Sequence, residues 1–163
     1  MHPEPERIAC HQAGHAVMQS ILARGRYRVA AVSLYGEGSC TVDRKQPCGF
    51  ARLDRETELN LYEYGLAQLS GIAAENRFLR EHPPEGEDLR GAVSDIQDWQ
   101  DTAMGLYRDE GRVRMLSMNI MAKLDAIFNE SPIWNVVNAL AEALLEKQTV
   151  AGDELQAILA ELP

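Results

Sequence analysis

Two histidines four residues apart, His11 and His15, are the residues whose type and spacing point most directly to chemistry. The surrounding stretch, residues 6–24, is expected to form a helix, on which four residues correspond to about 40° of rotation and about 6 Å of rise. Both imidazoles therefore leave the same face of the helix. Two neutral imidazole nitrogens placed in this way can hold one metal ion, and zinc is the usual choice.

Gln12, which lies between the two histidines, determines whether the site has a general base. The segment His11-Gln12-Ala13-Gly14-His15 has the spacing of the H-E-x-x-H pattern of zinc peptidases, in which the glutamate is the general base. Gln12 occupies the glutamate position, and its neutral amide cannot accept a proton. Because loss of a general base lowers a rate by about 10²–10⁴, we expect a metal site with little or no peptidase turnover. Glutamine there fits a natural pseudo-peptidase or a deliberate inactivation, and the natural form is favoured because the sequence shows no tag or linker segment.

A catalytic zinc site also needs a third protein ligand and an open position for water. The spacing of residues alone does not choose this ligand. The candidates are His2, His82, Glu75, Asp88, Asp95, Asp98 and Asp101. Asp98 and Asp101 are expected to belong to a solvated acidic helix face.

Apolar periodicity and helix-ending residues predict a mainly helical chain. Gly111 is expected to end the third helix, a break is expected near residues 117–119, and Ser131-Pro132 is expected to start the fifth helix. The tryptophans and methionines, including Met115 and Met118, are expected to be apolar packing residues. Helices are predicted over residues 6–24, from 54 or 57 to 81, 91–108, 113–128, 133–147, and from 152 or 153 to 162.

A small sheet is expected beside these helices, which makes the predicted fold class mainly α with a small β-sheet (α+β). Strands are predicted at residues 28–35, 40–42 and 49–53. In zinc peptidases an exposed edge strand holds the substrate backbone by accepting it as a further strand. We expect that edge to consist of Val29, Ala30, Ala31, Val32, Ser33 and Leu34; a strand that serves only for packing is the alternative.

Length and composition predict one soluble domain spanning residues 1–163. Hydrophobic residues make up 45% of the chain, charged residues 25%, and the net charge is −9. Such an acidic chain is not expected to bind nucleic acid, and no apolar run is long enough to insert in a membrane. No signal peptide is recognisable, and Cys10, Cys40 and Cys48 have no C-x-x-C spacing, so we expect reduced thiols and a cytoplasmic location.

Several segments follow one another in a characteristic order: Glu6-Arg7-Ile8-Ala9, His11 to Val17, the strand at Val29 to Leu34, Leu69-Ser70-Gly71-Ile72-Ala73-Ala74-Glu75, Gly91-Ala92-Val93-Ser94-Asp95-Ile96, Ala143 to Lys147, and Gly152-Asp153-Glu154. In this order they resemble the peptidase domain of FtsH-type ATP-dependent zinc metalloproteases, and the resemblance extends over nearly the whole chain.

The resemblance implies a helical zinc-peptidase domain that acts on unfolded or flexible polypeptide. The aspartate of its G-A-x-x-D segment completes the metal site, so His11, His15 and Asp95 are the expected zinc ligands. Glu75 is the alternative third ligand, or else a carboxylate that orients an imidazole.

Family members also carry an ATPase module and a membrane anchor, but this chain contains no G-x-x-x-x-G-K-[ST] segment. The chain is therefore not expected to unfold substrates by itself: it is either an excised piece or a free-standing relative that acts on flexible segments or beside a partner. A separate ATPase and self-association are the two partner arrangements considered. Because of Gln12, enzymatic activity is uncertain, and the main alternative is a pseudo-peptidase that serves as a peptide-binding or regulatory module. A helical protein without metal is a third possibility.

Overall fold

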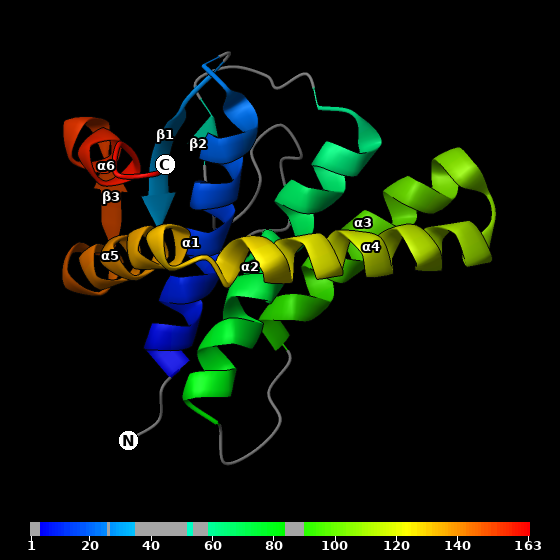
Figure 1. Ribbon diagram of the computed structural model, residues 1–163, viewed down its shortest axis with the longest axis horizontal. Coiled ribbons are helices and arrows are strands. Elements are labelled where there is room, and N and C mark those ends of the chain that lie inside the picture. Colours follow the sequence, from blue (N-terminus) through cyan, green and yellow to red (C-terminus); the bar gives the residue numbers. More distant parts are fainter. Residues whose placement is uncertain (1–3, 26, 35–51, 54–58, 84–89) are drawn as a thin grey trace.

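Helices make up most of the structure, and a small antiparallel sheet lies beside them (Figure 1). The computed structural model describes residues 4–25, 27–34, 52–53, 59–83 and 90–163, and every structural statement below concerns these residues. The mainly helical α+β class predicted from sequence is confirmed. The elements are α1 (Glu4–Ala23), β1 (Val29–Ser33), β2 (Arg52–Leu53), α2 (Leu61–Glu81), α3 (Arg90–Tyr107), α4 (Glu110–Phe128), α5 (Ser131–Lys147), β3 (Thr149–Ala151) and α6 (Gly152–Leu159).

Helix α1 runs through the interior and is packed by α2, α5 and β1 (Figure 1). All its residues from 9 to 19 are buried. Close packing of α1 on α2 depends on Gly14, since a Cβ there would lie 2.5 Å from the Cβ of Ala74 and 2.9 Å from the carbonyl oxygen of Ser70. The helix ends at Ala23, after which Arg24 and Gly25 have positive φ angles of 47° and 79°.

The sheet has three antiparallel strands in the order β2-β1-β3, so β1 is its middle strand. The prediction that residues Val29 to Leu34 form an exposed edge is therefore wrong. On one side Ala31 pairs with Ala151 of β3, and the amide of Leu34 donates to the carbonyl oxygen of Gln148 at 2.7 Å. On the other side Val29 pairs with Leu53 of β2. The error arose because β3 is only three residues long, too short to show alternation in the sequence.

Helix α2 begins later than predicted, at Leu61 instead of near residue 54 or 57. Asn60 caps it in a capping box: its side chain accepts from the amide of Glu63, and the Glu63 carboxylate accepts from the amide of Asn60. The N-x-x-E signal was present in the sequence. The strand expected at residues 40–42 and part of that at 49–53 lie outside the described residues, whereas Arg52–Leu53 is a strand as expected.

The turn between α3 and α4 lies at Arg108 and Asp109, so Gly111 falls inside α4 and does not end α3. Asp109 caps α4 by accepting from the amides of Gly111 and Arg112. The expected break near residues 117–119 is absent, since α4 is continuous through them. The Ser117 hydroxyl donates to the carbonyl oxygen of Val113 and accepts from the indole of buried Trp99, at 2.7 Å each. Helix α5 begins at Ser131, two residues before the predicted range of 133–147, and Glu130 takes the N-cap position expected for Ser131.

Candidate metal centre

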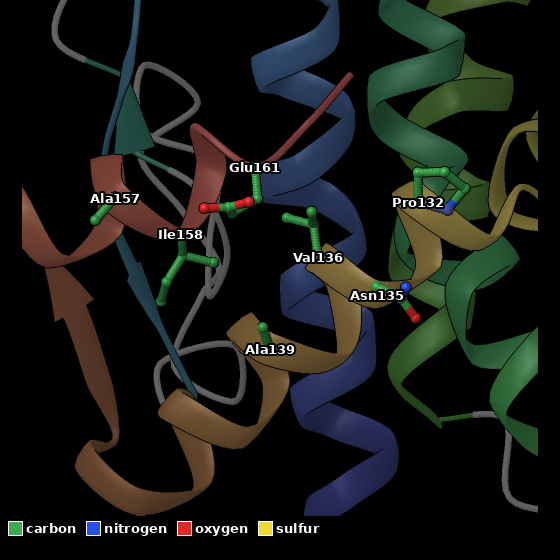
Figure 2. A pocket seen from close by; sticks show the side chains of 7 residues that line it. All are labelled: Pro132, Asn135, Val136, Ala139, Ala157, Ile158 and Glu161. Atoms are coloured by element: carbon green, nitrogen blue, oxygen red, sulfur yellow. The ribbon is translucent and has the colours of Figure 1, made fainter.

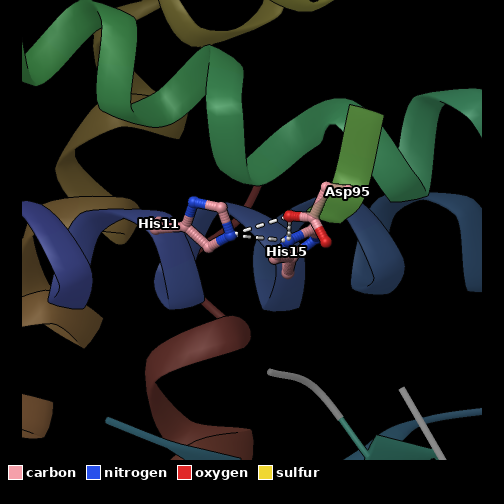
Figure 3. A group of neighbouring side chains, drawn as sticks. All are labelled: His11, His15 and Asp95. Atoms are coloured by element: carbon pink, nitrogen blue, oxygen red, sulfur yellow. Dashed lines mark hydrogen bonds and ion pairs between the residues drawn. The ribbon is translucent and has the colours of Figure 1, made fainter. Parts of the chain in front are cut away.

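Three side chains from two distant parts of the chain meet at one point: His11 and His15 on α1, and Asp95 near the start of α3 (Figure 3). One oxygen of Asp95, Oδ2, lies 2.9 Å from Nε2 of His11 and 3.1 Å from Nε2 of His15. The two Nε2 atoms are 3.1 Å apart. All three residues are buried, and His15 is completely inaccessible. The structure thus brings together the three residues predicted to hold a metal ion.

Helix α2 fixes the orientation of both imidazoles by binding their Nδ1 atoms. The Nδ1–H of His15 donates to the carbonyl oxygen of Ala67 at 2.9 Å, and the Ser70 hydroxyl oxygen lies 3.2 Å from the same nitrogen. The Nδ1–H of His11 donates to Oε1 of Glu75 at 2.7 Å. Because a carbonyl can only accept, the neutral His15 ring carries its hydrogen on Nδ1, which leaves the Nε2 lone pair for an ion.

Glu75 therefore binds the opposite side of His11 from the meeting point and is not part of the three-residue cluster. Its other oxygen accepts from the guanidinium of Arg7 at 3.2 Å, and both residues are buried. Of the two roles considered from sequence, the geometry favours the carboxylate that orients an imidazole. Arg7 was not singled out in the sequence, although its position four residues before His11 places it on the same helix face.

Gly71 leaves the space in which the two imidazoles converge. A Cβ at this position would lie 2.5 Å from Nε2 of His15 and 2.6 Å from Nε2 of His11, closer than side chains pack. In the sequence Gly71 stands only within the segment Leu69 to Glu75 that carries the family resemblance, and it was not expected to be a site residue. The glycine keeps carbon away from the two nitrogens that an ion needs.

In the absence of a metal, the carboxylates next to His11 favour the protonated form of its imidazole. Burial lowers the pKa of His11, but its hydrogen bonds to Asp95 and Glu75 outweigh this and raise the pKa to about 9. Burial raises the pKa of Asp95, yet the imidazoles of His15 and His11, whose protonated forms pair with the carboxylate, hold that pKa well below its usual range. A metal ion must therefore displace a proton from His11 at neutral pH.

The donor set fits a divalent metal ion. Zinc binds nitrogen and oxygen ligands at about 2.0–2.2 Å, and in a tetrahedron this separates the ligand atoms by about 3.3–3.6 Å. The observed separations of 2.9, 3.1 and 3.1 Å are a few tenths of an ångström shorter, so a small outward movement of the side chains would admit the ion. Two imidazoles and one carboxylate leave a fourth position for water, as in catalytic zinc sites, and the same set also suits other transition metals.

Gln12, at the position of the general base, is 1% exposed, and its side-chain oxygen has no hydrogen-bond partner. The other buried polar residues of α1 all have hydrogen-bond partners: Arg7, His11 and His15 as described, and Gln19 by accepting from the hydroxyl of Tyr27. The neighbouring Cys10 is also buried, which raises the pKa of its thiol to about 12 and makes it a poor ligand.

The remaining ligand candidates lie apart from the cluster. Asp98, Asp101 and His82 are exposed, and His82 stacks on Phe78. His2 and Asp88, like Cys40 and Cys48, lie outside the described residues. A groove of about 490 Å³ between α5 and α6 shares no residue with the cluster (Figure 2).

Comparison with models of known protein families finds no match, and no curated protein sequence is significantly similar to the chain. Within the described part of the chain, no helix is both long and apolar enough to cross a membrane.

Proposed function

We propose that this chain is a zinc-binding domain of the FtsH-type peptidase kind whose hydrolytic step is lost or strongly impaired by Gln12. The observation that supports the proposal is the meeting of His11 and His15 with Asp95, which lies 80 residues after His15 in the sequence. The assignment to the FtsH type is supported by the order of the sequence segments that resemble that peptidase domain. Unfolded or flexible polypeptide is the proposed substrate class.

The residues of the site divide into three roles. His11, His15 and Asp95 would hold the ion, and Glu75 and Ala67 orient the two imidazoles through Nδ1. Bound zinc would polarise a carbonyl and lower the pKa of its water to about 7. Gln12 can accept a hydrogen bond through its unpartnered oxygen, but it cannot take the proton that hydrolysis releases.

Two measurements, made one after the other, test this proposal. Elemental analysis of the purified chain, after zinc is supplied and excess is removed, should give one zinc per chain, and Asp95→Asn should lower this content. A chain that takes up no zinc would overturn the proposal. Gln12→Glu should then create zinc-dependent cleavage of an unstructured protein such as casein, at least 100-fold faster than the unaltered chain, in line with the contribution of a general base.

A second function is favoured by the chemistry of Gln12: a pseudo-peptidase that binds a peptide without cleaving it. An uncharged side chain at this position preserves the shape of the site and removes only the proton transfer. This alternative is supported if Gln12→Glu binds one zinc per chain, as the unaltered chain does, but cleaves neither casein nor a panel of unstructured peptides.

A further inference from the structure

The outer surface of α4 carries apolar and basic side chains where a solvated helix face is expected. Met115 and Met118 are 68% and 66% exposed, although the sequence suggested apolar packing residues. The side of α4 that packs towards α2 is formed by other residues, namely Val113, Ile120, Leu124 and Phe128. In Figure 1 the helix crosses the near side of the molecule with its outer surface uncovered.

The arrangement on this surface is that of a helix-packing seam. Met115, Met118 and Ala122 follow at intervals of three and four residues, the a–d–a spacing by which one helix packs along another. Arg112 and Arg114 fall at the flanking e and g positions, where charges select the partner helix. All five residues are exposed, as is Lys123. We call this set, Arg112, Arg114, Met115, Met118, Ala122 and Lys123, the α4 outer face.

The charge of the α4 outer face is opposite to that of the chain. From Arg112 to Lys123 there are three cations and no acidic residue, whereas the whole chain has a net charge of −9. Arg114 and Lys123 form no ion pair with other described residues. The ion pair of Arg112 with Asp109 is 3.9 Å long and exposed, so it competes weakly with a partner.

We propose that the α4 outer face is a docking site for an acidic amphipathic helix of a partner protein. Apolar residues of that helix would cover Met115 and Met118, whose flexible side chains adapt to different apolar surfaces. Aspartate or glutamate at its flanking positions would pair with Arg112 and Arg114. This inference does not depend on the metal site.

Two other occupants fit the surface less well. A two-fold pairing of α4 outer faces from two copies would bring the same arginines together, which is unfavourable. Helices that bind in a membrane surface use bulky Trp, Phe or Leu side chains, whereas this face offers two methionines and an alanine on an acidic chain.

Fluorescence anisotropy with two synthetic peptides tests the proposal. Both are 18-residue, end-capped, fluorescein-labelled helices with Leu at a and d; one has Glu and the other Lys at e and g. The full chain should bind the Glu peptide saturably, at least 10-fold more tightly than the Lys peptide, and more weakly as NaCl rises from 50 to 300 mM. Arg112→Glu with Arg114→Glu should reverse this preference, and Met115→Ser with Met118→Ser should weaken binding of both peptides at least 10-fold.

Leu145→Ser is the matched control, since Leu145 is an exposed apolar residue on α5 and should leave binding unchanged. Three results of the peptide assay would overturn the proposal: no saturable binding of the Glu peptide, equal affinity for both peptides, or binding that neither double variant alters. The proposal would also be overturned by evidence for another occupant. Such evidence would be a dimer in light scattering that Met115→Ser with Met118→Ser dissociates, or preferential binding of the chain to phosphatidylcholine vesicles containing 30% phosphatidylserine.

Discussion

Replacing Gly71 by alanine tests whether the space between the imidazoles is needed for metal binding. The added Cβ would lie 2.5 Å from His15 Nε2 and 2.6 Å from His11 Nε2. Ordinary carbon–nitrogen contact is about 3.5 Å, so the rings must retreat by about 1 Å. Metal–ligand distances tolerate only about 0.2 Å, and displaced ligands typically cost 10–100-fold in affinity. We therefore expect Gly71→Ala to weaken zinc binding by at least 10-fold.

The stability of the same variant provides a second, independent measure. Overpacking of a core costs about 1–3 kcal/mol, and the gain in helix propensity from glycine to alanine returns up to about 1 kcal/mol. Metal-free Gly71→Ala should therefore be less stable by about 0–2 kcal/mol in urea unfolding with EDTA. Gly105→Ala is the matched control, because Gly105 is an exposed residue of α3 whose Cβ would meet nothing within 4 Å. It should gain about 0.5–1 kcal/mol and leave zinc affinity unchanged.

Zinc affinity is best measured by competition with a chromophoric chelator, for wild type and both variants at one pH. If Gly71→Ala binds zinc as tightly as wild type and gains stability as Gly105→Ala does, the nitrogens of His11 and His15 are not held against α2 as described. The assignment of the metal site would then have to be abandoned.

Three further predictions concern the same part of the molecule. Asp95→Asn should weaken zinc binding at least 100-fold, about 3 kcal/mol, in the same chelator competition. The metal-free protein should lose stability as pH rises: the pKa of folded His11 is about 9 against an ordinary 6.5, so the contribution of its charge is complete below pH 6.5 and is lost as pH rises through about 9. Urea midpoints in EDTA should fall over this range in wild type and much less in Asp95→Asn. Gly14→Ala should destabilise the protein by about 2–3 kcal/mol in urea, because its Cβ would collide with Ala74 and with backbone that cannot move aside.

Local geometry explains which parts of the site could be predicted from sequence. The four-residue spacing of His11 and His15 determines their common face on any helix, so two donors follow directly from the motif. Asp95 is distant in sequence, and only the order of several segments pointed to it. Gly71 could not be recognised, because its importance lies in what a Cβ would touch across the helix interface.

The elements of the fold could be predicted where the apolar periodicity extends over many residues, and could not where an element is only a few residues long. Helices α1, α3 and α5 were predicted to within about two residues from periodic apolar positions. Strand β3 was missed because three residues cannot show a period, and the position of β1 in the sheet changed as a result. The exposure of Met115 and Met118 was missed because methionine packs equally well in a core and on a binding surface.

The depth of α1 has a kinetic consequence for any ion bound there. His15 is 0% exposed, and His11 and Asp95 are each 8% exposed. A chelator, like a substrate carbonyl, can approach the ion only at its open fourth position, so the three buried donors release the ion only when helices separate locally. Its rate of loss should be independent of chelator concentration at saturation and should match the slow hydrogen exchange of α1 amides. The residence time of the metal would then report the rate at which the helices around α1 open locally.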